Sequence, residues 1–185
     1  STLHQGISTI SGTERRAQLR AKIKKGELVI APGVFEMISA KVADRMGFDA
    51  LYMTGYGTVA SYLGLPDAGI ATYSDMVGRV TAMAGMARTP LIADADTGYG
   101  GVMNVRRTVR AYERAGVAGI HIEDQQWPKR CGHLAGKSVI PVGDMVSKVK
   151  AATDARHDDD FVIIARTDAL AVEGFEAAMA RCQAY

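Results

Sequence analysis

The stretch Pro90-Leu91-Ile92-Ala93-Asp94-Ala95-Asp96-Thr97-Gly98-Tyr99-Gly100 decides the fold, because a short apolar run passes directly into carboxylates and glycines. A continuous apolar run of this length is typical of a parallel strand buried on both faces. The same succession recurs along the chain, where other apolar runs precede polar or glycine-rich residues. These runs are Leu28–Ala31, Ala50–Met53, Gly119–Ile122 and Phe161–Ala165. The sequence therefore predicts five buried strands with polar C-terminal ends.

Helical patterns separate these strands. They predict helices over Phe35–Met46, Asp75–Ala87 behind a Ser74 cap, Val105–Ala115 behind Asn104, Met145–Arg156 behind Asp144, and Gly174–Tyr185. Repeated alternation of strand and helix implies right-handed crossovers and a parallel sheet. The carboxyl ends of parallel strands meet at one edge, so we expect the polar residues to gather there.

Two architectures place a site at such an edge, a (β/α)₈ TIM barrel and an open doubly wound sheet. Polar residues follow all five predicted strands, whereas an open sheet concentrates them at one switch point. The sequence also contains neither a G-x-G-x-x-G nor a Walker motif. We therefore expect the α/β class and a TIM barrel, of which this chain covers the first five strands.

The number of strands is the difficulty for this prediction. A complete barrel has eight strands and usually about 200 to 250 residues, whereas the chain has 185. We expect residues 1–185 to form a single barrel domain that is truncated at its C-terminus, with residues 1–26 as a helical segment before the first strand. Two alternatives stay open: the missing strands are supplied in another way, or the sheet is open.

Composition narrows the class of partner. The chain is 48% hydrophobic and 23% charged with a net charge of +2, which is typical of a globular domain. Basic residues are interleaved with acidic ones, and no segment reaches the roughly 18 apolar residues of a membrane span. We therefore expect a small-molecule substrate, no nucleic-acid partner and no membrane partner. Two cysteines in unlike contexts do not indicate a disulfide framework, so the expected location is cytoplasmic.

Three carboxylates are candidate metal ligands. Asp94 and Asp96 alternate at a strand end, where a period of two places them on the same side. Glu123 follows the next strand. Mg²⁺ typically takes one or two protein carboxylates and fills its remaining positions with water and substrate oxygens. The alternative is that Asp94 or Asp96 caps the glycine-rich turn and the helix behind it.

The segment Lys129-Arg130-Cys131-Gly132-His133 places cations on both sides of a thiol. Neighbouring positive charges favour the thiolate, so Cys131 is a candidate proton donor or acceptor. A buried structural cysteine is the alternative. By contrast, Cys182 has apolar neighbours on a predicted helix and is assigned to the core. His121 lies within a predicted strand and is interpreted as a hydrogen-bonded core histidine.

Arg166 ends the fifth predicted strand, where its guanidinium could bind a substrate carboxylate with two hydrogen bonds. A structural ion pair with Asp168 or Glu123 is the alternative. The Thr54-Gly55 pair offers a hydroxyl and backbone N–H groups at another strand end, although a glycine turn explains it nearly as well. Asp67, in Leu65-Pro66-Asp67-Ala68-Gly69, is a turn residue on its local sequence alone.

Taken together and in this order, four motifs resemble the isocitrate lyase and phosphoenolpyruvate mutase superfamily. They are Asp94-Ala95-Asp96-Thr97-Gly98-Tyr99-Gly100, Glu123-Asp124-Gln125, Lys129-Arg130-Cys131-Gly132-His133 and Ala165-Arg166-Thr167-Asp168. The resemblance implies an (α/β)₈ barrel that assembles as a homotetramer. Leu63-Gly64-Leu65-Pro66-Asp67 also looks like a family segment, which makes Asp67 a candidate site residue. Thr54 stands where serine is usual, a change that keeps the hydroxyl.

The resemblance also implies roles for the candidate residues. Mg²⁺, or Mn²⁺ in its place, would be held by Asp94, Asp96 and Glu123. The α-keto acid end of the substrate would contact Tyr52, Thr54, Gly55 and Arg166, and Asp67 would be a further substrate-binding residue. Cys131 would be the acid/base, supported by Lys129 and His133 on a loop that closes over the substrate.

The expected function is that of a Mg²⁺-dependent carbon–carbon lyase, an oxo-acid-lyase. Its substrate would be a 2-hydroxy di- or tricarboxylate of the 2-methylisocitrate or 2,3-dimethylmalate kind, cleaved to an α-keto acid such as pyruvate and a second carboxylate. Three alternatives remain: an oxaloacetate hydrolase or decarboxylase, a phosphonomutase of the same superfamily, and an inactive truncated binding domain.

Overall fold

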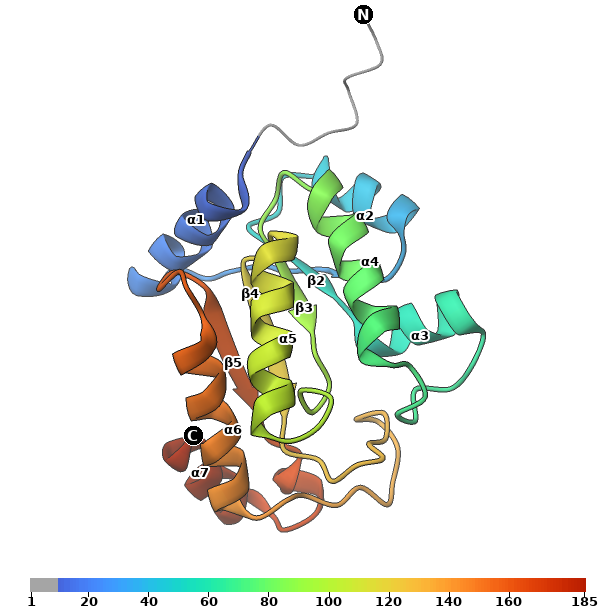
Figure 1. The fold of residues 1–185 in the computed structure, drawn as a ribbon, viewed down its shortest axis with the longest axis vertical. Coiled ribbons are helices and arrows are strands. Elements are labelled where there is room, and N and C mark those ends of the chain that lie inside the picture. Colours follow the sequence, from blue (N-terminus) through green and yellow to red (C-terminus); the bar gives the residue numbers. More distant parts are fainter. Residues whose placement is uncertain (1–9) are drawn as a thin grey trace, which may run out of the picture.

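The computed structural model describes residues 10–185 and contains a five-stranded parallel sheet in the order β1-β2-β3-β4-β5 (Figure 1). The strands are β1 (Gly33–Val34), β2 (Leu51–Met53), β3 (Leu91–Asp94), β4 (Gly119–Glu123) and β5 (Val162–Arg166). Each strand pairs with the next one in the chain, whereas a doubly wound sheet reverses its order at a switch point. The TIM-barrel prediction is therefore confirmed for the strands that this chain contains.

Helices alternate with the strands and cover the outer face of the sheet. They are α1 (Gly12–Lys24), α2 (Met37–Asp44), α3 (Gly55–Leu63), α4 (Tyr73–Met86), α5 (Val102–Ala115), α6 (Val142–Ala155) and α7 (Phe175–Ala184), with a short 3₁₀ turn, η2 (Ala169–Ala171). Figure 1 shows α4, α5 and α6 side by side in front of the sheet. The main core lies between this layer and the strands, where Met83, Tyr112 and Ile120 are fully or almost fully buried.

The helix α1 closes the N-terminal end of the strands. Its Leu19 packs with Ile92 and Val162 in a second, smaller core. Its Arg15 donates to the carbonyl oxygens of Ala87 and Gly116, which lie just before β3 and β4. The expected N-terminal helical segment thus contains α1, while residues 1–9 of that segment lie outside the described residues.

The first strand begins later than predicted. Leu28 and Ile30 are 82% and 53% exposed, and β1 comprises Gly33 and Val34. The backbone of the predicted run still approaches its neighbour, because the Ala50 N–H donates to the Ile30 carbonyl. Pro32 has no N–H to donate, which limits regular pairing before Gly33. The prediction of a buried strand over Leu28–Ala31 is wrong.

Three predicted helix caps are also wrong. The α4 cap is Thr72 rather than Ser74, and the Thr72 hydroxyl accepts from the Asp75 N–H at 3.3 Å. Gly101 rather than Asn104 precedes α5, and Pro141 rather than Asp144 precedes α6. Each helix begins two or three residues before its predicted start, so the polar residues that were assigned as caps lie in the first turn.

Burial differs across the sheet. Every residue of β3 and β4 is buried, as their apolar sequences predict. Only Val162 of β5 is buried, and Ile164 is 36% exposed, so the prediction of burial on both faces is wrong there. Among residues 10–185, no helix is both long and apolar enough to cross a membrane.

Candidate active site

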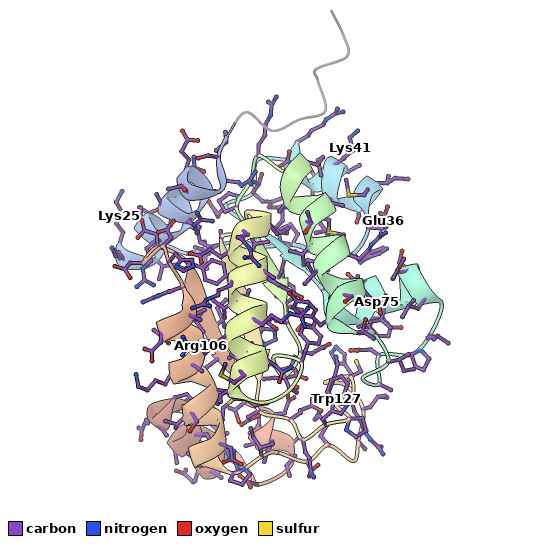
Figure 2. All side chains as sticks on the ribbon, in the orientation of Figure 1. Lys25, Glu36, Lys41, Asp75, Arg106 and Trp127 are labelled. Atoms are coloured by element: carbon purple, nitrogen blue, oxygen red, sulfur yellow. The ribbon has the colours of Figure 1, made fainter. Side chains whose placement is uncertain are left out.

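A cavity of about 500 Å³ opens at the C-terminal ends of the strands. The loop after β4, which carries Trp127, runs past this end of the molecule (Figure 2). The cavity is lined by Tyr52, Thr54, Gly55, Tyr56, Asp67, Asp94, Glu123, Lys129, Arg130, Cys131, Gly132, His133 and Arg166. The structure therefore brings together every candidate site residue except Asp96, which is joined to this wall through a lysine.

Asp94 is fixed at the end of β3 by backbone donors. The Gly55 N–H donates to Oδ2 at 3.1 Å, and the Asp96 N–H donates to Oδ1 at 2.9 Å. A Cβ on residue 55 would lie 2.4 Å from Asp94 Oδ2, so only glycine allows this close approach. Gly55 begins α3, and the Thr54 hydroxyl caps that helix by accepting from the Gly57 N–H at 3.2 Å. The alternative of a plain glycine turn at Thr54-Gly55 is therefore wrong.

Lys129 bridges two buried carboxylates from distant parts of the chain. Its Nζ lies 2.6 Å from Asp67 Oδ1 and 2.7 Å from Asp96 Oδ1, and all three side chains are buried. Burial opposes the charged ammonium, but Asp96 and Asp94 raise the pKa of Lys129 above its usual value. The lysine expected to support Cys131 thus contacts the carboxylates of Asp67 and Asp96.

Glu123 and Arg166 line the same cavity from the ends of β4 and β5. Arg166 Nη1 lies 3.2 Å from Glu123 Oε2, and its Nη2 lies 2.9 Å from Asp168 Oδ1. Gln125 donates to Glu123 Oε1 at 3.0 Å and to Asp168 Oδ2 at 3.2 Å. Both ion pairs that were the alternative for Arg166 are present. Because Arg166 is still part of the lining, they also fix its guanidinium in the cavity.

The loop that carries Cys131 is fastened at both ends. Gln125 Oε1 accepts from the Arg130 N–H at 2.9 Å, and Lys137 donates to the Gly132 carbonyl oxygen. A Cβ on residue 132 would lie 2.4 Å from Arg166 Nη2, so glycine lets the loop backbone approach the guanidinium. Cys131 is partly buried in the lining, and His133 lies exposed at the rim.

The carboxylates of Asp94, Asp96 and Glu123 differ in how readily they ionise. Burial and the negative charge of Asp94 raise the pKa of Asp96 to about 7 and that of Glu123 to about 8. Burial also acts to raise the pKa of Asp94, but the contact with His121 and the charges of His121 and Lys129 lower it overall. Carboxylates that resist ionisation together in a cavity are typical of functional sites.

The donor set suits a hard divalent cation. In the described part of the chain, no three His, Cys, Asp or Glu side chains are already gathered as ligands. Mg²⁺ does not require a closed protein cage, because one or two carboxylates and several waters satisfy it. Asp94, Asp96 and Glu123 supply only oxygen atoms, and a cation would supply the missing charge. These residues therefore fit the predicted ion.

Sequence reasoning missed two residues of this site and misassigned one residue outside it. His121 was interpreted as core, and it is buried, but its Nδ1 lies 2.8 Å from the Tyr52 hydroxyl. Gln125 organises the Cys131 loop, and its position after Glu123 was the only signal for it. Cys182 is exposed on α7, so its assignment to the core is wrong.

Comparison with known proteins identifies the family to which the chain is similar. The family model described as phosphoenolpyruvate phosphomutase matches residues 19–185. The 2,3-dimethylmalate lyase of Eubacterium barkeri is 50% identical over 169 residues, which are 91% of this chain and 58% of the lyase. The 2-methylisocitrate lyase of Aeropyrum pernix is 50% identical over 90% of this chain and 53% of its own length. The chain thus spans between half and three-fifths of these two relatives.

Solved structures agree with this placement. Oxaloacetate acetylhydrolase in complex with 3,3-difluorooxalacetate has a TM-score of 0.89 and 44% identity, covering 94% of this chain and 60% of that chain. Phosphonopyruvate hydrolase, in complex with oxalate and Mg²⁺, has a TM-score of 0.84 and 37% identity, covering 92% and 59%. With a barrel wall, a carboxylate-lined cavity and these relatives, the chain belongs to the phosphoenolpyruvate phosphomutase family, within the PEP mutase/isocitrate lyase superfamily.

Proposed function

We propose that the protein is a Mg²⁺-dependent carbon–carbon lyase. Its substrate is a 2-hydroxy di- or tricarboxylate of the 2-methylisocitrate or 2,3-dimethylmalate kind, cleaved to an α-keto acid such as pyruvate and a second carboxylate. The observation that carries this proposal is that one cavity contains a carboxylate cluster, the Arg166 guanidinium and the Cys131 thiol. Two relatives at 50% identity are lyases of these two substrates.

The carboxylates of Asp94, Asp96 and Glu123 would hold the cation in this proposal. When bound, Mg²⁺ withdraws electron density from the substrate oxygen that becomes the keto group. A relative of known structure contains this ion together with oxalate. Arg166, with the Thr54 hydroxyl, binds the carboxylate of the α-keto acid unit, and Gly55 contacts that unit.

Cys131 supplies the proton that completes cleavage. As the carbon–carbon bond breaks, its electron pair leaves with the second fragment as a carbanion next to a carboxylate. The thiol proton of Cys131 is transferred to that carbanion, and the substrate hydroxyl loses its own proton to a carboxylate of the lining as the carbonyl forms. Tyr52 and Asp67 line the same cavity, where they contact the substrate.

A second candidate is oxaloacetate hydrolysis, which the likeness to oxaloacetate acetylhydrolase favours. Both reactions would bind a keto acid through the same residues, so their products distinguish the two functions. The protein is incubated with Mg²⁺ and each of 2-methylisocitrate, 2,3-dimethylmalate and oxaloacetate, and pyruvate and oxalate are quantified. Pyruvate that forms from 2-methylisocitrate or 2,3-dimethylmalate and disappears with EDTA supports the lyase, and oxalate from oxaloacetate supports the hydrolase. Absence of both products contradicts the proposal.

Assembly and location complete the proposal. We propose a cytoplasmic homotetramer, on the resemblance to the superfamily and on the globular composition of the chain. Sedimentation velocity tests the assembly, because a mass of four chains is expected. A monomer at micromolar concentration would contradict it.

A further inference from the structure

The buried imidazole of His121 lies behind residues that line the cavity and has no role in the proposed function. His121 lies in β4 two residues before Glu123, so both side chains are on the same side of the strand. That side is the inner face of the barrel wall, because the intervening Ile122 packs in the core under the helices. His121 therefore lies one layer below the cavity wall rather than within the apolar core.

Two oxygen atoms lie near one nitrogen of this ring. His121 Nδ1 is 2.8 Å from the Tyr52 hydroxyl oxygen and 3.7 Å from Asp94 Oδ1. The rings of Tyr52 and His121 are 6.0 Å apart and tilted by 58°, so they meet through polar atoms rather than by stacking. Tyr52 and Asp94 belong to the cavity lining. His121 lies next to both of them, on the side away from the cavity.

The position of Asp94 decides which atom of the Tyr52–His121 pair is the donor. An ionised carboxylate accepts hydrogen bonds only, so its presence beside Nδ1 favours a hydrogen on that nitrogen. The Nδ1–H group then donates to the Tyr52 oxygen. The phenolic hydrogen is therefore free to point elsewhere, and the open direction at Tyr52 is the cavity. Burial and the charge of Asp94 raise the pKa of Tyr52, so its hydroxyl keeps that hydrogen.

We propose that His121 is a positioning residue whose imidazole holds the Tyr52 hydroxyl as a hydrogen-bond donor to the substrate oxygen in the cavity. This inference rests on the proposed lyase function. A donor that is already oriented toward an oxygen where negative charge develops stabilises the transition state more than the bound substrate. His121 acts through Tyr52 and does not itself touch the substrate.

Two substitutions of similar polarity distinguish a positioning role of His121 from a packing role. In His121→Asn the side-chain amide nitrogen takes the place of Nδ1, whereas in His121→Gln it takes the place of Nε2. We expect His121→Asn to keep kcat within about threefold of the wild type and His121→Gln to lose at least about tenfold, on the scale of one lost donor. Equal loss in both variants overturns the inference. Equal urea midpoints establish that both variants are folded, and His121→Ser replaces His121→Gln if the latter does not fold.

A double-mutant cycle tests whether His121 works through the Tyr52 hydroxyl. Tyr52→Phe removes the hydroxyl and keeps the ring. We expect His121→Gln to lower kcat at least about tenfold in the wild type and less than twofold in the Tyr52→Phe background. A purely structural role would cause the same loss in both backgrounds, and that result contradicts the inference.

Binding of oxalate with Mg²⁺, measured by calorimetry, provides a readout that does not need turnover. The affinity for oxalate is expected to stay at the wild-type level in His121→Asn and to fall at least threefold in His121→Gln. If the wild-type protein cleaves none of the substrates, the proposed function fails, and these affinities still decide the role of His121. If the wild type is active and the two variants bind oxalate equally, only the inference about His121 fails.

Discussion

The two ends of the sheet both bury charged side chains, but they neutralise them differently. At the N-terminal end, Glu113 of α5 accepts from the backbone N–H groups of His157 and Asp158 at 2.7 to 3.0 Å. Arg16 of α1 pairs with Asp158 at 2.5 Å and donates to the Glu113 carbonyl at 3.3 Å. At the C-terminal end, Asp94, Asp96 and Glu123 lie close enough to raise the pKa of two of them.

This difference distinguishes a structural cluster from a functional one. At the N-terminal end, each charged side chain of the cluster contacts a backbone group or an opposite charge. The cluster therefore joins α1 and α5 to the loop before β5. At the C-terminal end, Asp94, Asp96 and Glu123 also have partners, but the negative charge of Asp94 still helps to raise the pKa of Asp96 and that of Glu123. Such an arrangement costs stability and is explained by a ligand that supplies the charge. Changes at the two ends should therefore affect different properties.

The largest effect is expected for Asp94→Asn, which keeps the shape of the side chain and removes its charge. Turnover should fall at least about 1,000-fold, equivalent to about 4 kcal/mol, because the cation loses its most firmly held ligand. Calorimetry with Mn²⁺ should show the corresponding loss of affinity. Asp158→Asn is the matched control at the other end, and it should leave turnover unchanged. Full Mn²⁺ affinity in Asp94→Asn would remove this residue from the metal site.

The second-largest effect is expected for substitution of the Cys131 thiol. Cys131→Ser should lower kcat roughly 100-fold or more, the usual scale for a positioned general acid, while the affinity for oxalate with Mg²⁺ stays the same. Cys182→Ser is the control, because that thiol is exposed on α7 away from the cavity. The measurement is kcat for the two variants side by side. Equal activity of Cys131→Ser and wild type would exclude the thiol from the mechanism.

Sequence predicted the fold well because its strongest signals are local. Four of the five apolar runs coincide with strands to within two residues, since each run is short, continuous and followed by polar residues. The run Leu28–Ala31 has the same composition but is largely exposed, and composition does not reveal exposure. The helix α3 was missed because Gly55 and Gly57 have low helix propensity. The cap at Thr54 was the available signal for it.

The candidate site was predicted as a set of residues, and its connections were not. Lys129 was expected beside Cys131, two positions away, whereas it contacts Asp67, which lies 62 residues earlier in the chain. The place of His121 in an apolar strand predicts that it is buried, but not that its ring contacts the Tyr52 hydroxyl. Spacing in sequence identifies which residues reach the edge of the sheet. Contacts between loops depend on packing that a single sequence does not encode locally.

At the N-terminal end, Glu113→Ala should cost stability and leave chemistry intact. The substitution leaves the partly buried N–H groups of His157 and Asp158 without their acceptor, which is expected to lower the free energy of unfolding by about 1 kcal/mol. Glu113→Gln keeps one acceptor oxygen and should lose less. Urea denaturation measures the difference, and kcat of the folded variant should match the wild type. A large fall in kcat without loss of stability would reverse the comparison between the two ends.

The smallest effect is expected for Asp96→Asn in the metal-free protein. The pKa of Asp96 is about 7 in the folded chain and about 3.9 when unfolded. The folded state therefore binds the proton more tightly, so the stability from this group is full at pH 4 and is lost as the pH rises to about 7. With EDTA present, wild-type stability should decline between about pH 4 and 7, and Asp96→Asn should decline less over the same range. Adding Mg²⁺ should stabilise the wild type more at pH 8 than at pH 5, because the ion competes with this proton. Parallel pH profiles of the two proteins would mean that the charge of Asp96 is compensated by its partners as completely as that of Glu113 at the opposite end. The distinction between the two clusters would then fail at this residue.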